Sequence, residues 1–324
     1  MRFLAPVLLA CLSAAPAANA EHHGPPWNSP VAWSQSIHQG GATIQIDLAP
    51  GALDLPHAQV VQWIDTAARA VSLYYGHFPV SHARVLIVPA PSLDGVLSGT
   101  TWGDVDGYRA FTRIRLGQHT TPRELADDWT MTHEFVHTAL PSLASDHHWL
   151  EEGIATYVEP IARAQLGTLT PAYVWKETVE GMPHGEPLPS QPGLAPALDL
   201  SHSWGTTYWG GALFCLMADV KIREQTGNRK GLQDALRGIL AAGGSIAVDW
   251  PIAKVIAVAD QATGTSVLAD LYKQMGQSPH VPIDLDKLWN RLGIGIAGSQ
   301  VVFDNNAPLA PIREAITTPT TNPR

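Results

Sequence analysis

Residues 131–157 read MTHEFVHTALPSLASDHHWLEEGIATY, the densest group of chemically active side chains in the chain. His133 and His137 stand four positions apart, so a helix would place both rings on one face, one turn apart. Two imidazoles at this spacing can bind one metal ion from a rigid base. Glu134 lies one residue along, where its carboxylate can reach a water molecule on the metal without being a ligand. The pattern predicts a hydrolytic metal site; the alternative is a helix with two surface histidines and a glutamate.

A third metal ligand is expected from the segment that follows. Catalytic zinc commonly takes three protein ligands and keeps a fourth position for water. The segment that begins at Trp149 carries Glu151 and Glu152, and a short loop allows it to pack as a helix antiparallel to the first and present a carboxylate to the metal. His133 and His137 are therefore predicted to hold one Zn²⁺ ion together with a carboxylate of that helix. His147 and His148 are rival ligands, but neither stands at a helical spacing from His133.

The string HEFVH followed by WLEEGIATYVE resembles the gluzincin zinc metallopeptidases, the peptidase MA-like group that includes thermolysin and aminopeptidase N. The resemblance is most specific across 133–157. Matched position by position, it implies that Glu152 is the glutamate ligand and that Glu134 is the catalytic base. It also implies a zincin-like fold and a peptide or protein substrate. The connection between the two strings is shorter than in aminopeptidase N, so the match is to the wider group.

A further resemblance lies at Tyr208, where Tyr-Trp-Gly-Gly-Ala is similar to the family's Tyr-x-Lys-Gly-Ala stretch at the start of a helix. In that family the tyrosine hydroxyl binds the oxyanion of the tetrahedral intermediate, and the resemblance gives this role to Tyr208. Gly210 replaces the family's lysine, and the alternative is a tyrosine that simply starts a buried helix. His202 is a candidate second oxyanion donor, or else a solvated loop histidine.

The family's exopeptidase box, Gly-Ala-Met-Glu-Asn, has no counterpart near its usual place at 107–116. No acidic residue stands ready there to bind the free amine of a substrate, so the resemblance does not extend to aminopeptidase specificity. Residues 110–116 alternate as a strand with one exposed face. They are a candidate edge strand, which could pair with an extended substrate while Arg113 and Arg115 face the cleft.

Before residue 120 the pattern predicts a mixture of strands and helix. Residues 21–40 are rich in Pro, Gly, His and Ser and are expected to be irregular, and residues 96–107 are expected to form a loop. Strands are expected at 42–48, 83–88 and 110–116, and a helix is expected at 56–75.

After residue 120 the pattern becomes helical. Thr121 can cap a helix that has Pro122 at its first position, and this helix is expected to run to about Ala139. Residues 167–200 contain six prolines and are expected to form a long loop or flap. The segment after Gly293 is rich in Gly and Pro and is expected to lie on the surface. Further helices are expected at 148–166, 208–226, 232–240, 251–262, 266–275 and 285–292.

The expected fold class is α+β and zincin-like. An N-terminal mixed α/β lobe with an edge strand precedes a mainly helical C-terminal lobe, and the active-site helix lies between them. The expected division is a removed signal peptide at 1–20, an N-terminal lobe at 21–120, a catalytic zinc-binding region at 121–227, a helical lobe at 228–295 and a surface tail at 296–324.

The first twenty residues have the pattern of an export signal. A positive start is followed by an apolar run at 3–15, and Ala-Asn-Ala at 18–20 offers the small residues that a signal peptidase reads. The mature chain is therefore predicted to begin near Glu21 and to be secreted or periplasmic. The alternative is a lipoprotein anchored through Cys11, although the apolar stretch before Cys11 is very short for that.

Net charge, apolar stretches and cysteine content limit the kinds of function that the chain can have. The formal net charge of the 324 residues is −9, whereas a nucleic-acid-binding protein would show clustered Lys and Arg. Outside the leader no stretch is long and apolar enough to span a membrane. Cys215 lies in an apolar helical stretch and is predicted to be a buried, inert thiol. An exported zinc metallopeptidase fits best; the alternatives are a non-catalytic peptidase-like binding protein of the cell envelope and a zinc hydrolase of a non-peptide amide.

Overall fold

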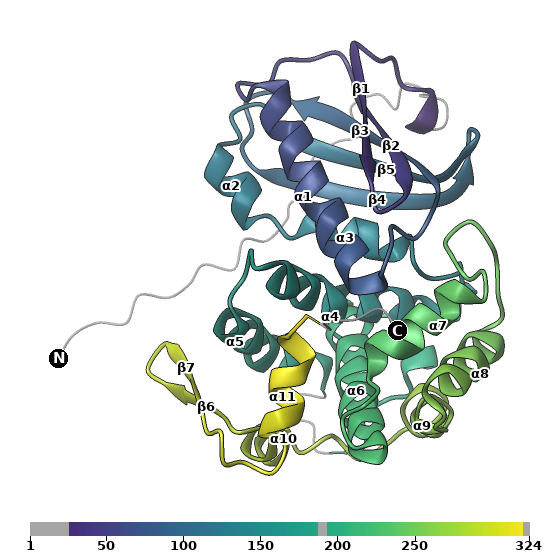
Figure 1. Cartoon of the computed structure of the whole chain (residues 1–324), viewed down its shortest axis with the longest axis vertical. Helices are drawn as coiled ribbons and strands as arrows, with labels where there is room; N and C mark the ends of the chain where they lie inside the picture. Colours follow the sequence, from purple (N-terminus) through teal and green to yellow (C-terminus); the bar gives the residue numbers. More distant parts are fainter. Residues whose placement is uncertain (1–25, 187–192, 320–324) are drawn as a thin grey trace.

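The computed structural model describes residues 26–186 and 193–319, which form two lobes joined at a waist (Figure 1). A sheet with one long helix makes the N-terminal lobe, and helices make most of the C-terminal lobe. The expected mixed fold class is therefore confirmed. The predicted signal peptide, Cys11 included, lies outside the described residues. Within the two described ranges, no helix has both the length and the apolar character needed to cross a membrane.

The N-terminal lobe is built on a five-stranded sheet. Its strands are β1 (Trp33–Gln39), β2 (Ala42–Leu48), β3 (His82–Ala90), β4 (Val96–Val105) and β5 (Tyr108–Gly117). Their order across the sheet is β1-β2-β3-β5-β4. The three central strands run parallel to one another, while β1 and β4 run antiparallel to their neighbours at the two edges.

Both edges of this sheet differ from the sequence prediction. β1 lies in the segment expected to be irregular, and β4 lies in the segment expected to be a loop. Residues 110–116 do form a strand, but β5 is paired on both sides, so the edge-strand prediction was wrong for them. Arg113 and Arg115 accordingly do not line the cleft described below. The edge strand on this side of the sheet is β4. Its sequence was interpreted as a loop because it contains Gly99 and Gly103.

Helix α1 (His57–Tyr75) packs across one face of the sheet and forms the main core with it. In β3, Val85 points to this core while Leu86 points to the opposite face, as the two-residue repeat of a strand requires. On that opposite face Leu86 and Phe111 are fully buried beneath aromatic side chains that include Trp102 of β4. A second, smaller core therefore lies on this face of the sheet, and Trp102 of β4 packs against it.

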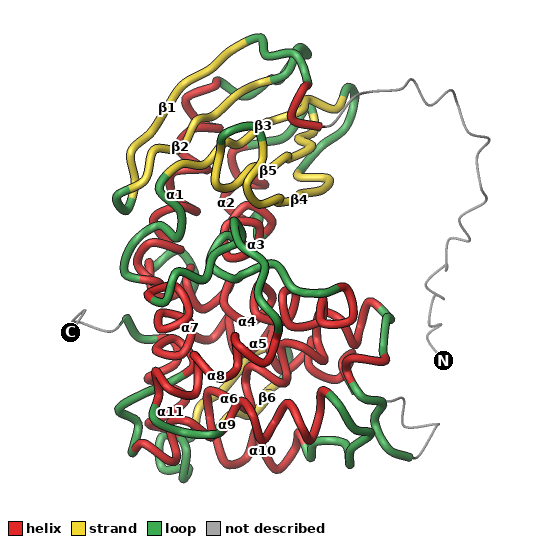
Figure 2. The backbone as a smooth tube through the Cα atoms, turned by 90° about the vertical axis from the view of Figure 1, so that its right-hand side faces the viewer, coloured by secondary structure: helices red, strands yellow, loops and turns green. Residues whose placement is uncertain are grey.

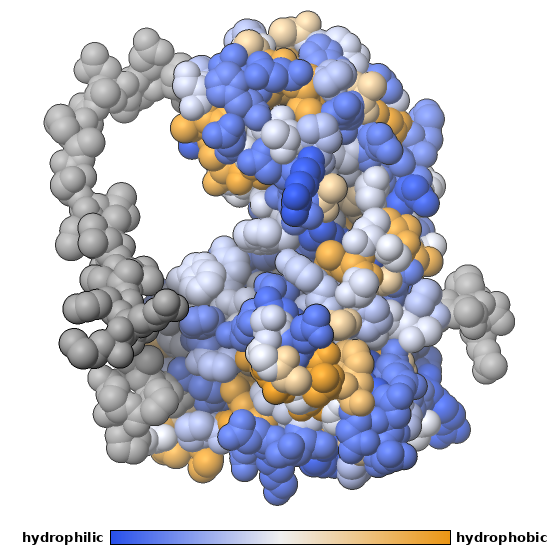
Figure 3. All heavy atoms as spheres, turned by 90° about the vertical axis from the view of Figure 1, so that its left-hand side faces the viewer, coloured by the Kyte–Doolittle hydropathy of each residue, from blue (hydrophilic) through white to orange (hydrophobic). Residues whose placement is uncertain are grey.

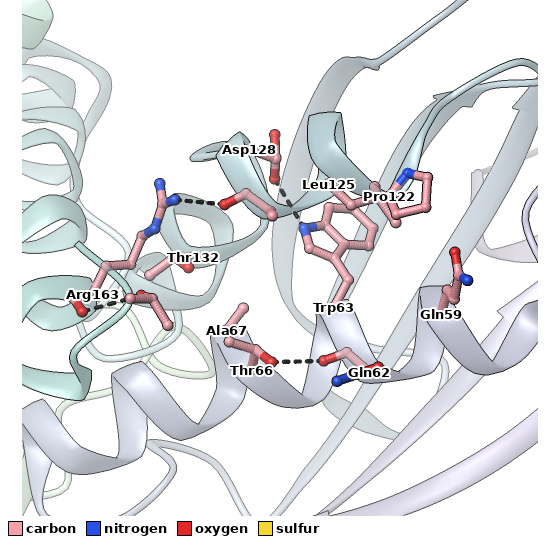
Figure 4. A pocket seen from close by; sticks show the side chains of 12 residues that line it. Gln59, Gln62, Trp63, Thr66, Ala67, Pro122, Leu125, Asp128, Thr132 and Arg163 are labelled. Carbon is pink, nitrogen blue, oxygen red and sulfur yellow. Dashed lines mark hydrogen bonds between the residues drawn. The ribbon is translucent and has the colours of Figure 1, made fainter.

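The helix predicted from Pro122 onward divides in two. Its parts are α2 (Pro122–Asp127) and α3 (Thr130–His137). The break falls at Asp128, whose carboxylate accepts a hydrogen bond from the backbone N–H of Met131 at 3.0 Å. The same carboxylate accepts a hydrogen bond from Nε1 of Trp63 in α1 at 3.2 Å (Figure 4). The side chain of Asp128 therefore satisfies one free N–H group in the first turn of α3 and ties that turn to α1.

Eight helices follow in the described part of the C-terminal lobe. They are α4 (His148–Leu166), α5 (Pro171–Gly181), α6 (Gly211–Thr226), α7 (Leu232–Ala241), α8 (Ile252–Thr263), α9 (Val267–Leu271), α10 (Leu285–Leu292) and α11 (Ala310–Thr317). Most begin and end within a few residues of their predicted bounds. α5 is an exception, because it lies in the segment 167–200 that was expected to be a loop or flap. Thr170 caps it, and its proline stands at the first position, where a helix tolerates proline.

Two other parts of this lobe differ from the prediction. A π-helical turn, Thr206–Gly210, precedes α6, so Tyr208 lies on that turn and not inside the helix. After Gly293 the chain forms a hairpin of β6 (Ile294–Ala297) and β7 (Gln300–Phe303) before α11. α11 packs against α4 and α6 and is not merely a surface covering. Cys215 is buried in α6, as predicted.

The helices α4 and α6 pack with their backbones in contact. A Cβ atom on Gly153 would lie 2.4 Å from the Cα atom of Gly211, and a Cβ atom on Gly211 would lie 2.1 Å from the carbonyl oxygen of Trp149. Glycine allows this approach because it has no side chain to obstruct it. The contact holds the turn that carries Tyr208 beside the part of α4 that carries Glu152.

Candidate functional site

A cleft of about 760 Å³ lies at the waist between the two lobes. Figure 2 shows the lobes parting on one side of α3, and Figure 3 shows the surface hollowed there. β4 forms one wall, and α3, the start of α4 and Tyr208 form the other. Part of β4 is covered, because a Cβ atom on Gly103 would lie 1.8 Å from the carbonyl oxygen of Ile246. Residues 96–102 of the strand line the cleft.

Three side chains with metal-binding atoms meet in this cleft. His133 and His137 come from α3, and Glu152 comes from α4. Oε2 of Glu152 lies 3.0 Å from Nε2 of His133 and 3.6 Å from Nε2 of His137. Within residues 26–186 and 193–319, this is the one group of three His, Cys, Asp or Glu side chains placed closely enough to hold a metal ion. The structure thus brings the three predicted ligands together.

The donor set and its spacing fit a tetrahedral zinc ion. Zinc bonds to imidazole nitrogen and carboxylate oxygen are about 2.0–2.2 Å long, which puts neighbouring ligand atoms about 3.4 Å apart. The separations of 3.0 and 3.6 Å from Glu152 to His133 and His137 lie on either side of that value. Two imidazoles and one carboxylate are also a typical set for a catalytic zinc ion, which binds water as well.

The surroundings of His133 and Glu152 favour the protonation states that a metal ion needs, whereas the surroundings of His137 favour its protonated ring when no metal is bound. Burial lowers the pKa of His133, although its hydrogen bond to Glu152 acts in the other direction, so the ring is held neutral. Burial alone would lower the pKa of His137, but the hydrogen bond and charge of Glu152 outweigh it and raise the pKa. Burial raises the pKa of Glu152, but the hydrogen bonds to the two histidines lower it by more. The net pKa is therefore lowered, and the carboxylate stays ionised.

Glu134 is held against β4. It is buried, and its Oε2 accepts a hydrogen bond of 2.7 Å from the hydroxyl of Thr101. The hydroxyl of Thr112, in β5, lies 3.0 Å from that of Thr101. Gly99 leaves room for the carboxylate, because a Cβ atom there would lie 2.6 Å from Oε1 of Glu134. The carboxylate is therefore oriented by the edge strand and is not one of the three clustered donors.

Tyr208 lies on the other side of the metal-binding group. Its ring is nearly parallel to that of His133, with centroids 6.1 Å apart and an interplanar angle of 16°. Burial, and next the negative charge of Glu152, raise the pKa of Tyr208. The hydroxyl therefore remains protonated and is a hydrogen-bond donor at the cleft, with the carboxylate of Glu152 within its reach. The π-helical turn beneath it is a local irregularity of the kind found often at functional sites.

The remaining histidine candidates have other positions. Nε2 of His148 lies 3.3 Å from Oε1 of Glu152, so this residue contacts a proposed ligand from outside the group of three. His147 is turned away, with Nδ1 3.0 Å from Oδ1 of Asp199. His202 is exposed and is not among the residues that line the cleft. The structure therefore does not bring His147 or His202 to the metal-binding group.

Sequence reasoning missed Asp199, which supports the start of α4. Its carboxylate accepts hydrogen bonds from Nε1 of Trp149 at 2.8 Å and from the hydroxyl of Tyr272 at 2.8 Å, and it also contacts His147. Trp149 stands three residues before Glu152, so this contact anchors the ligand's helix. No local motif marks Asp199. Thr101 was missed because its strand was interpreted as a loop, although the run Thr-Thr-Trp at 100–102 has strand propensity.

The fold of this chain is similar to that of a solved structure. No protein-family model matches the sequence, and no curated protein matches it either. A solved structure of an aminopeptidase N family protein from Idiomarina loihiensis superposes with a TM-score of 0.59 at 13% identity, over 81% of this chain and 49% of that one. A mutant M1 zinc metallopeptidase from Deinococcus radiodurans, bound to a Tyr-Ser-Ala substrate, gives a TM-score of 0.49 at 13% identity, over 77% and 53%.

The first of these likenesses, at a TM-score of 0.59, shows that the chain has a gluzincin-like peptidase fold. The chain spans about half the length of each of the two solved structures.

Proposed function

We propose that this protein is an exported metallopeptidase that hydrolyses peptide bonds with one zinc ion. The observation that carries the proposal is the position of Glu134. Glu134 lies in the same cleft as His133, His137 and Glu152. It is not one of the three clustered donors, and a hydrogen bond from Thr101 orients its carboxylate. A site that only bound a metal would have no need of a fourth, separately held acid.

Each residue has a distinct task in this proposal. Zinc bound by the three donors would make a water molecule more acidic and polarise the scissile carbonyl. Glu134 accepts the proton of the attacking water and passes it to the leaving amine. Tyr208 donates its hydroxyl hydrogen to the oxyanion that develops on the carbonyl oxygen. Thr101 keeps the carboxylate of Glu134 in one orientation, so that little reorganisation is needed during proton transfer.

The open edge of β4 supports a peptide as the substrate. A strand at the edge of a sheet has unpaired backbone N–H and C=O groups, and an extended peptide can pair with them. Residues 96–102 line the cleft directly above Glu134. A peptide added there would present successive peptide bonds to the metal site. A small non-peptide amide would leave most of this edge unused.

The test is the substitution Glu134→Gln in the zinc-loaded protein. We expect the variant to keep its zinc, because Glu134 is not a ligand, and to lose at least about 10²-fold in turnover of a denatured protein, the lower end of what a general base contributes. Wild-type protein with bound zinc that cuts no peptide would favour the envelope-binding alternative. Hydrolysis of non-peptide amides alone would favour the other alternative.

Export is the part of the proposal that depends on the first twenty residues. N-terminal sequencing of the protein recovered from producing cells is expected to show a chain that begins near Glu21 in the periplasm or medium. Recovery of the chain with a lipid on Cys11 would replace this view with the lipoprotein alternative. An intact N-terminus in the cytosol would contradict both.

A further inference from the structure

A second, smaller cavity of about 200 Å³ adjoins the metal-binding group. It shares Trp129, His133 and Tyr208 with the main cleft, so the two spaces lie on either side of the same side chains. Its floor is one face of α4, formed by Thr156, Pro160 and residues near them, which continues from Glu152 along the helix. A molecule held at the metal site could therefore extend a group into this cavity.

Aromatic rings form much of the wall of this cavity. Trp129, Tyr173 and Trp204 keep 53%, 46% and 64% of their surface exposed. Trp204 stacks on Tyr208, with centroids 5.7 Å apart and an interplanar angle of 25°. Large aromatic side chains that remain exposed around a hollow mark a binding surface, because their burial against a ligand would be favourable. The ligand group must therefore have an apolar part that packs between rings.

Acidic side chains outnumber arginine and lysine in the lining of this cavity. Glu159, Glu177 and Asp127 line it, while Arg163 is its one basic side chain. Arg163 is already engaged, by Oε1 of Glu159 at 2.8 Å and by the carbonyl oxygen of Ala126 at 3.1 Å. Glu177 has no ion-pair partner within the described parts of the chain. The cavity therefore offers an anionic group without a counter-charge beside aromatic faces.

We infer that this cavity is a specificity site for a basic side chain, lysine or arginine, next to the scissile bond of the substrate. The aliphatic stem of such a side chain packs between the rings, and its cation lies over the aromatic faces and near Glu177. An acidic side chain is repelled there, and an uncharged one leaves Glu177 unpaired. This inference rests on the proposed function, because it names the substrate residue that the same site selects.

The experiment compares two peptides that differ at one position, one with lysine and one with norleucine, which has the same stem without the charge. Binding of each peptide to Glu134→Gln protein is measured by calorimetry, and cleavage by the wild type is measured as kcat/KM. We expect the lysine peptide to bind more tightly and to be cleaved faster. Glu177→Gln is expected to reduce this preference by about three- to fivefold, in line with partly exposed ion pairs.

A matched control lies on the same helix. Glu180 pairs with Lys176 at 3.4 Å and does not line the cavity, so Glu180→Gln should leave the preference unchanged. Tyr173→Leu, at a half-exposed position, should reduce the preference for lysine by removing one ring. Equal effects of Glu177→Gln on both peptides, or no preference in the wild type, would overturn the inference. Preferential binding of lysine without any cleavage would keep the inference and contradict the catalytic proposal instead.

Discussion

The carboxylate of Glu134 is placed by β4 as much as by its own helix. Thr101 donates a hydrogen bond to one of its oxygens, and Gly99 leaves space for the other. A sequence motif can place Glu134 next to His133 on a helix, but it does not show what faces the carboxylate from another part of the chain. His133, His137 and Glu152 were predictable because helical spacing and one short loop determine their positions. Thr101 and Gly99 depend on a strand pairing that the sequence does not display.

Gly99→Ala should therefore damage catalysis without unfolding the protein. The new methyl group would meet the movable end of the Glu134 side chain at 2.6 Å, so the carboxylate should swing away from its position. We expect kcat to fall by about tenfold or more, with zinc content and thermal unfolding nearly unchanged. Gly193→Ala is the control, because a Cβ atom there meets nothing within 4 Å. A variant with wild-type kcat would show that Gly99 does not protect the position of Glu134.

At the scale of elements, the contact between α4 and α6 sets the distance from Glu152 to Tyr208. The backbones touch at Gly153 and Gly211, and Asp199 anchors the start of α4 from outside. The predicted helices α1, α4 and α10 were placed correctly because apolar periodicity and terminal glycines mark them, whereas α6 begins at Gly211 and not at Tyr208. The break at Asp128 escaped the prediction because a side-chain contact to Trp63 in α1 stabilises it. Long-range contacts of this kind leave no local pattern.

Gly153→Ala should separate these two helices. The added methyl group would lie 2.4 Å from the Cα atom of Gly211, and backbone cannot move aside as a side-chain end can. Overpacking of this kind costs about 1–3 kcal/mol. We expect the free energy of unfolding in urea to fall by that amount and zinc affinity to weaken, because Glu152 moves with α4. Unchanged unfolding and zinc affinity would mean that the close approach does not constrain the site.

At the scale of the whole molecule, the helix that carries the proposed ligand Glu152 also carries a buried acid whose titration affects stability. Glu159 and Arg163 form a buried pair on α4, about two and three turns beyond Glu152. Burial raises the pKa of Glu159 to about 7, although the charge and hydrogen bond of Arg163 act in the other direction. The folded chain therefore binds a proton at Glu159 over a pH range in which the unfolded chain has released it.

The sign of the resulting pH dependence follows from linkage. Because the folded pKa lies above the unfolded value of 4.5, the contribution of Glu159 is fully present below pH 4.5 and is lost as pH rises to about 7. The loss is at most about 3 kcal/mol, at 1.36 kcal/mol per pKa unit. Glu159→Gln removes this dependence, so its unfolding free energy relative to the wild type should rise across that range in denaturant titrations. A constant difference at all pH values would place the pKa of Glu159 near its ordinary value.

The central claim is that His133, His137 and Glu152 together hold one metal ion, and the zinc content of the purified protein tests it most directly. We predict about one zinc ion per chain for the wild type after dialysis against buffer without chelator. Glu152→Ala should fall well below that while remaining folded, because it removes one of three ligands. Glu151→Ala, with a side chain outside the group of three, should retain the zinc. Full zinc occupancy in Glu152→Ala, or none in the wild type, would contradict the account.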